Sequence, residues 1–360
     1  MYEHFIKKRV PLHWGGLSDG FCHFEKRFGI SLKLLKFFDS IDYPIVFSTK
    51  GTIMTEPEYL EIFKRKPQNY EFAFSIITSD PEMAKKIEVG VPSPQQRLEA
   101  MRIMSNIGCR TILRLRPYII GCSSLTSVDL LEKAKDAGAS GVSTEFFCLD
   151  TRVGEFTQNR YKKISEAIGF DIVNYYKKLS IDQGYLRLNK KVKEPYILEL
   201  FKNCRRLGLN FACSDPDFKE LSDSNCCCCV MKQPFACGQF TTAIRHARQH
   251  GTVTWDDIAK DLEWAKKVFL PDTGVSFINE HVSISKDLIA ETRENLTVFD
   301  YIRGIWNNPK SSQKSPFKYF HGKIKPISLD SQNNVVYKYI RDSSDTEFEK
   351  IEKEFQKVIE

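Results

Sequence analysis

Short apolar runs alternate with longer amphipathic stretches along the first 146 residues. The apolar runs are too short for helices, and several are rich in β-branched or aromatic residues, which is typical of buried strands. These predicted strands cover residues 10–14, 44–48, 71–77, 110–115 and 141–145.

Helix signals occupy the stretches between these runs. Possible capping boxes stand at residues 55–58 and 93–96, a third start lies at 126–129, and Gly108 and Gly138 stand where helices end. Repeating strand–helix units predict a parallel sheet, because parallel neighbours need a crossover helix. An open or partial (β/α) barrel and a doubly wound sheet both fit this pattern.

The pattern loosens after residue 150. We expect a C-terminal extension, mostly helical, over 151–308 with a cysteine-rich segment at 213–237, and a linker with a terminal helix over 309–360. Within these parts the sequence predicts helices at 159–179, 195–207, 239–249 and 254–268, a strand at 210–213, an extended polar linker at 308–332 and a solvated helix from 344 onward.

Composition favours a cytoplasmic globular protein. Hydrophobic residues make up 42% and charged residues 28%. No apolar run approaches the ~18 residues of a membrane span, and no apolar stretch follows the basic N-terminus, so neither a membrane nor a signal peptide is expected. The net charge of +7 is a weak indication of nucleic acid as a partner. Its basic clusters are residues 190–206 and 303–325, for which solvated surface is the ordinary interpretation.

Polar residues recur where the predicted strands end. The first run is followed by Gly15, Gly16, Ser18 and Asp19, and the second by Lys50. Glycines let a ligand approach the backbone, and hydroxyl, carboxylate and ammonium groups suit amines, ribose and carboxylates. Further strand-end candidates are Ser75 and Arg116. In a parallel sheet these groups share one edge, and together they suit a zwitterionic ligand that carries a ribose.

Four segments carry a family resemblance. They are LHWGGLSDGF, VFSTKG, FAFSIITSDPEMAKKIEVGVPSPQQRLEAMRIMSNIG and ILRLRPYIIG, in this order within residues 10–146. They resemble radical S-adenosylmethionine (SAM) enzymes of the spore-photoproduct-lyase-like, or DNA repair photolyase-like, group. The resemblance implies a TIM-like (β/α) barrel, SAM bound by Gly15, Gly16, Ser18, Lys50, Ser75 and Arg116, and a match of Glu88 and Arg97 to acidic and basic family positions. A structural salt bridge between the last two is an equal alternative.

The cysteine motif of the resembling family is absent. Such enzymes hold a 4Fe–4S cluster on three thiolates, usually CxxxCxxC, and this spacing occurs nowhere in the chain. The fold expected is therefore a partial (β/α) TIM-like barrel that lacks its first strand. Three explanations stay open: a missing N-terminal segment, which we favour, a second chain that supplies the cluster, or a degenerate relative without radical chemistry.

A second group of cysteines lies further along the chain. Cys213, Cys226, Cys229 and Cys237 could bind an auxiliary Fe–S cluster or zinc, and a reduced, inert cysteine patch is the alternative. Cys22 and Cys148 are weak candidates for a catalytic thiol, since both are more often core residues.

Two functions follow from these patterns. The first is a radical SAM-type enzyme core, lyase-like and incomplete in this chain, that acts on nucleic acid. The second is a non-catalytic, metal-binding interaction module with a TIM-like fold.

Overall fold

The chain folds into two compact units, which the computed structural model describes for residues 6–16, 18–180, 184–224, 240–269, 296–310, 312 and 314–356. The sheet unit comprises residues 11–214 together with the end of the chain from residue 346, and the second unit comprises mainly residues 215–345. The sheet continues past residue 150, where the sequence suggested a first boundary.

The sheet unit is built on six parallel strands. They are β1 (Leu12–Trp14), β2 (Ile45–Thr49), β3 (Tyr70–Ser75), β4 (Arg110–Tyr118), β5 (Gly141–Phe146) and β8 (Asn210–Cys213). Their order in the sheet is their order in the chain, and each pairs in parallel with the next. A doubly wound sheet reverses its strand order, so the topology is that of a partial TIM-like fold. A closed barrel is not seen in the described strands.

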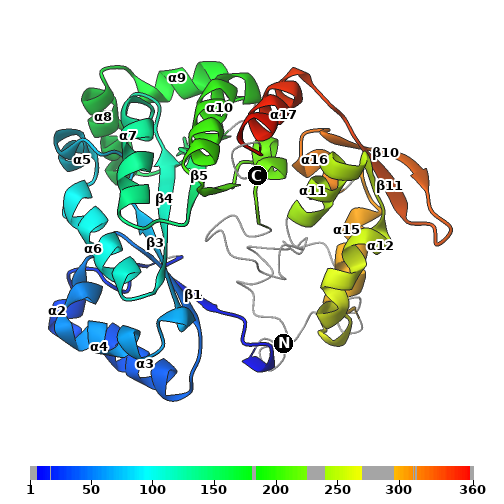
Figure 1. The fold of residues 1–360 in the computed structure, drawn as a ribbon. Helices are drawn as coiled ribbons and strands as arrows, with labels where there is room; N and C mark the ends of the chain where they lie inside the picture. The colour runs from blue at the N-terminus through cyan, green and yellow to red at the C-terminus, as the bar shows by residue number, and fades with distance from the viewer. Residues whose placement is uncertain are drawn as a thin grey trace. The chain divides into compact units, whose positions relative to one another are not determined.

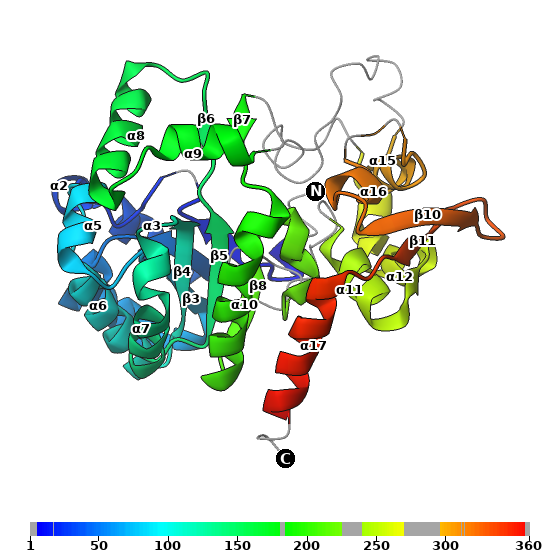
Figure 2. The ribbon, with the colours of Figure 1, turned by 90° about the horizontal axis from the view of Figure 1, so that it is seen from above.

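Helices connect the strands, and α6 and α7 run along one face of β3 and β4 (Figures 1 and 2). The connecting elements are α2 (Glu25–Phe28), α3 (Ile30–Ser40), η1 (Ile53–Thr55), α4 (Pro57–Arg65), η2 (Pro67–Asn69), α5 (Pro81–Ile87), α6 (Pro94–Asn106), α7 (Ser123–Asp136) and α10 (Lys190–Arg206). Between β5 and α10 the chain forms β6 (Leu149–Asp150), α8 (Glu155–Ile168), α9 (Ile172–Leu179) and β7 (Tyr185–Leu186). The single helix expected over 159–179 is broken at Gly169, whose φ is 80°.

Aromatic side chains form the centre of the sheet unit. Phe47 on β2 stacks on Phe72 of β3 at a centroid distance of 5.0 Å, and Phe63 of α4 meets Phe72 edge-on at 5.1 Å. Every residue of β2 and β3 is buried. Strands covered on both faces are continuous apolar runs, which explains why the sequence pattern located them.

The second unit is a mixed α/β body. Its elements are η3 (Pro216–Leu221), α11 (Thr241–His250), β9 (Thr252–Val253), α12 (Trp255–Ala259), η4 (Lys260–Lys267), α15 (Val298–Trp306), α16 (Pro316–Tyr319), β10 (Ile324–Leu329), β11 (Val335–Tyr339) and the start of α17 (Ser343–Gln356). Trp255, Trp306 and Tyr337 lie in its core. The strands form an antiparallel sheet in the order β10-β11-β9, so this part of the extension is less helical than expected.

Two expectations for the end of the chain need correction. The polar stretch 308–332 is not a linker, because it contains α16 and β10. β10 pairs with β11 through its backbone, while only its first residue, Ile324, is buried, so it has no apolar pattern. The terminal helix is present as α17 but is not wholly solvated, since Phe348 is 2% exposed and meets Phe201 of α10 edge-on at 5.4 Å. In the described residues no helix is long and apolar enough to cross a membrane.

Candidate functional site

The loop after β1 brings two glycines to the carboxyl edge of the sheet. Gly15 has a φ of +105°, and a Cβ atom there would lie 2.0 Å from the carbonyl oxygen of Ser48 on β2. Gly15 is thus required by the contact between β1 and β2, whether or not a ligand binds. A Cβ on Gly16 would meet no atom within 4 Å, so Gly16 is the glycine whose backbone faces open space.

Asp19 joins this loop to the end of β2. Its carboxylate accepts hydrogen bonds from the Thr49 hydroxyl at 2.8 Å, the Lys50 backbone N–H at 2.7 Å and the Phe21 backbone N–H at 2.9 Å. Because both oxygens are occupied, Asp19 positions the site instead of offering a ligand contact. Ser18 beside it is exposed and makes no hydrogen bond to another described residue.

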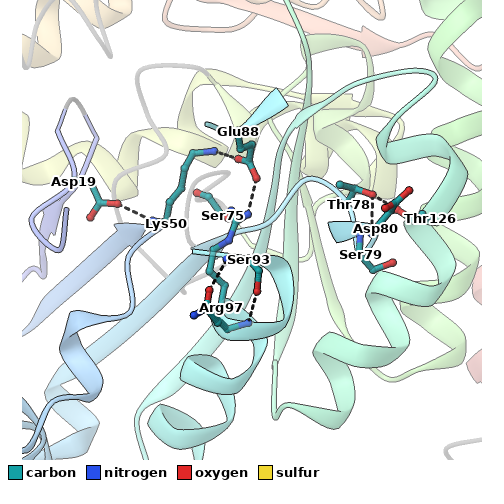
Figure 3. A network of polar contacts seen from close by, with 11 residues as sticks. Asp19, Lys50, Ser75, Thr78, Ser79, Asp80, Glu88, Ser93, Arg97 and Thr126 are labelled. Carbon is teal, nitrogen blue, oxygen red and sulfur yellow. Dashed lines mark hydrogen bonds and ion pairs between the residues drawn. The ribbon is translucent and has the colours of Figure 1, made fainter. Parts of the chain in front are cut away.

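A chain of charges links the ends of β2 and β3 (Figure 3). The Lys50 ammonium pairs with Glu88, which follows α5, and the other oxygen of Glu88 accepts from Arg97 at 2.7 Å. Arg97 of α6 also donates to the backbone oxygen of Ser75 at 2.6 Å. The Arg97 side chain is fully buried and that of Glu88 is 6% exposed, whereas that of Lys50 is 35% exposed. Lys50 is therefore the member of this charge network that a ligand can reach.

The network of Lys50, Glu88 and Arg97 carries one net positive charge at the sheet edge. Burial by itself would raise the pKa of Glu88, but the charges and hydrogen bonds of Lys50 and Arg97 outweigh burial and hold that pKa below its ordinary value. Glu88 is thus ionised at neutral pH, and two cations share one anion. Lys50 has three ammonium donors and uses one on Glu88, so it can bind a ligand carboxylate as well.

Two further arginines brace the strand ends. Arg114 on β4 donates to the hydroxyl of Ser75 at 3.2 Å, so Ser75 is engaged through both its backbone and its side chain. Arg116, also on β4, pairs with Glu145 on β5 and is 13% exposed. The peptide bond between Arg116 and Pro117 is cis. Ser75 and Arg116, which the sequence suggested as ligand contacts, both have protein partners.

The loop after β3 is tied to α7. The hydroxyls of Thr78 and Thr126 are 2.8 Å apart, and Ser79 bonds to Asp129. Asp80 caps α5 by accepting from the backbone N–H groups of Glu82 and Met83. These contacts, visible on the right of Figure 3, hold the loop after β3 in place at the sheet edge, next to Ser75.

The candidate thiols have ordinary surroundings. Cys22, in the loop before α2, and Cys148, after β5, are both partly exposed and form no disulfide with a described residue. The Cys148 thiol lies 3.5 Å from the backbone oxygen of Phe146. No contact assigns either thiol a role.

The predicted metal ligands are only partly covered by the structure. Cys213 is buried at the end of β8, while Cys226, Cys229 and Cys237 lie outside the described residues. Among the residues that are described, no three His, Cys, Asp or Glu side chains are arranged to hold a metal ion.

The first basic cluster of the sequence is only partly exposed. Lys193 is 2% exposed, Arg205 stacks on Phe201 at 4.4 Å, and Arg206 pairs with Glu132 at 2.6 Å. Lys191 at the start of α10 is exposed.

Comparisons with known proteins found similarity in solved structures. Spore photoproduct lyase complexed with dinucleoside spore photoproduct shares 16% identity at a TM-score of 0.43, over 58% of this chain and 64% of that one. SuiB of Streptococcus suis bound to the precursor peptide SuiA shares 12% identity at a TM-score of 0.32, over 60% and 51%. The chain thus spans less than two thirds of either protein. No family model and no curated protein matches the sequence.

Proposed function

We propose that the sheet unit is a radical SAM-type enzyme core that binds SAM at the carboxyl edge of its sheet. The observation that carries this proposal is the position of Lys50: a partly exposed cation, held by a buried Glu88–Arg97 pair. It stands at the edge where open parallel sheets bind their ligands. The segments that resemble the radical SAM family include these same residues, which supports the choice of SAM.

The donors at this edge fit part of the SAM molecule. The Lys50 ammonium suits its carboxylate, and the Ser18 hydroxyl and the open backbone at Gly16 suit its amine or ribose hydroxyls. Asp19 holds the loop in place through its bonds to Thr49 and Lys50. Asp19 is therefore proposed as a positioning residue, unlike the direct contact that the sequence suggested.

Glu88, Arg97 and Gly16 each have a separate role in the proposed binding site. Glu88 keeps the Lys50 side chain at the edge, and the buried Arg97 keeps Glu88 ionised and close to β3. Gly16 leaves the space above the loop unfilled. SAM, when bound, would supply the adenosyl group for radical chemistry. Nucleic acid is the substrate class that we propose for this chemistry.

Binding of SAM tests the proposal directly. Isothermal titration of the full-length protein with SAM should show binding, and Lys50→Met should weaken it by about tenfold or more, because a charge-assisted hydrogen bond contributes about 1.5–3 kcal/mol. Lys64→Met is the matched control, since Lys64 is an exposed lysine of α4 without an ion pair to a described residue. Absence of binding to the wild type, or an equal loss in both variants, would refute the proposed site.

A further inference from the structure

The helices α2 and α3 lie at one end of the sheet unit (Figure 1). They carry a stripe of exposed apolar side chains. Phe37 is 56% exposed, Ile30 53%, Ile41 51% and Leu34 40%. The stripe also includes Phe24 and Phe28 of the preceding turn, at 57% and 51%. Contiguous exposure of this kind is uncommon on a protein surface and marks an interaction site.

The spacing of the stripe is that of one helix side. Residues 30, 34, 37 and 41 follow the i, i+4, i+7, i+11 pattern that brings side chains into one row. A second helix packs along such a row by fitting its side chains between those of the first.

The stripe lies on one flank of α3, meaning to one side of its crest, the most solvent-exposed line of the helix. Successive helical residues turn by about 100°. The buried side of α3 is centred on Ser31 and Leu35, and Lys33 stands opposite that side. A flat membrane would meet the crest with Lys33 first, whereas a helix lying alongside α3 reaches the stripe. The geometry favours a helical partner over a lipid surface.

The charge beside the stripe on α3 is positive and uncompensated. Lys33, like Arg27 of α2, forms no ion pair with a described residue. Lys36 lies on the opposite flank of α3, about 130° around the helix from the stripe. The neighbouring acids are already engaged: Asp39 pairs with Arg65, and Asp42 with Lys66.

The other two nearby carboxylates are engaged as well. Glu56 pairs with Lys26, and buried Glu25 accepts hydrogen bonds from Ser31, Leu32 and Tyr59. A partner with acidic residues along one flank complements such a rim, whereas a second copy of the same face would set like charges against each other.

We propose that the α2–α3 stripe docks an acidic amphipathic helix of a second protein. Apolar residues of that helix would cover Ile30, Leu34, Phe37 and Ile41, and its acidic flank would face Lys33. The site is separate from Lys50, so its test is independent of SAM binding.

A synthetic peptide provides the probe. It is a fluorescein-labelled helix with leucines at i, i+4, i+7 and i+11 and glutamates along one flank, compared with its scrambled form and with a version in which lysines replace the glutamates. Fluorescence anisotropy with the full-length protein should show binding of the acidic peptide at least tenfold tighter than of either control peptide. Binding should weaken with added salt.

Two kinds of variant separate the contributions. Phe37→Ser should weaken acidic-peptide binding about tenfold, whereas Phe156→Ser, at a phenylalanine of α8 that is 78% exposed, should leave it unchanged. Lys33→Glu should shift the preference toward the lysine peptide, whereas Lys36→Glu, on the opposite flank of α3, should not. Circular dichroism of each variant confirms folding, which these exposed positions should not disturb.

Three results would overturn the proposal. The first is equal affinity for the acidic, lysine and scrambled peptides. The second is binding to vesicles of phosphatidylcholine and phosphatidylglycerol that Phe37→Ser abolishes, which would assign the stripe to a membrane. The third is a wild-type dimer in light scattering that Phe37→Ser converts to a monomer, which would assign it to a second copy.

Discussion

The buried pair of Glu88 and Arg97 gives the sharpest test of how the site is held together. Glu88→Ala removes the anion and leaves the guanidinium of Arg97 buried, with the backbone oxygen of Ser75 as its one remaining acceptor among the described residues. Breaking a buried pair from one side costs about 3–5 kcal/mol. Arg97→Met should cost less, about 1–3 kcal/mol, because Glu88 keeps Lys50 and a methionine fills much of the volume.

Hydrogen exchange followed by mass spectrometry measures this difference locally. Peptides covering β3 and α6 should lose protection more in Glu88→Ala than in Arg97→Met. Glu99→Ala is the control, because Glu99 forms an exposed pair with Arg102 that contributes about 0.2–1 kcal/mol. If Arg97→Met costs as much as Glu88→Ala, the buried cation is not the source of the penalty and the reasoning fails.

The same pair predicts a dependence on pH. The pKa of Glu88 in the folded protein lies below its ordinary value of 4.5, so its ionised form stabilises the fold. That contribution is complete well above pH 4.5 and is lost as the pH falls through the lowered pKa. Glu88→Gln cannot titrate, so its deficit relative to the wild type should be constant near neutral pH and shrink below about pH 4.5. A deficit that grows on acidification would contradict this sign.

Three other predictions concern single features of the two units. Gly15→Ala should cost more than 2 kcal/mol by chemical denaturation, because its φ is positive and a Cβ would overlap a neighbouring carbonyl, whereas Gly16→Ala should change stability by less than 1 kcal/mol. Lys323→Met in the second unit should cost about 3 kcal/mol, since it leaves buried carboxylates without their cation, and the exposed Lys350→Met should cost under 0.5 kcal/mol in the same assay. Anaerobic purification with metal analysis should find iron or zinc bound, lost when the cysteines of 226–237 become serine; metal-free protein would contradict the predicted centre.

The strands of the sheet could be predicted because their signals depend on residues that are close together in the sequence. The strands β2 and β3 are short, fully buried runs, and Ser93 and Gln96 form the capping box that their spacing indicates. Two predicted helix starts were wrong, because the hydroxyl groups expected to cap them bond to other residues. Thr55 does not cap α4, because its hydroxyl donates to the backbone oxygen of Thr52 in a preceding 3-10 turn. Thr126 lies inside α7, and its hydroxyl bonds to Thr78.

The location of the candidate site at the sheet edge could be predicted from the sequence, but the interaction partners of its residues could not. Strand ends share one edge in any parallel sheet, so the grouping of Lys50, Ser75 and Arg116 followed from the strand assignment. Their partners did not follow, because Arg97 and Glu145 come from other elements and any of these side chains could have faced solvent. The alternative salt bridge between Glu88 and Arg97 is the arrangement that the structure contains.

The position of α17 affects how the chain folds as it is synthesised. This helix follows the second unit in the chain, yet Phe348 packs on Phe201 of the sheet unit, whose strands are all made before residue 215. The intervening second unit must leave the ribosome before the helix can dock. During that interval the apolar surface around Phe201 stays uncovered, and such transient exposure promotes aggregation. A chain ended before residue 343 would keep that surface uncovered permanently, so truncation there removes part of the first-made unit and not a dispensable tail.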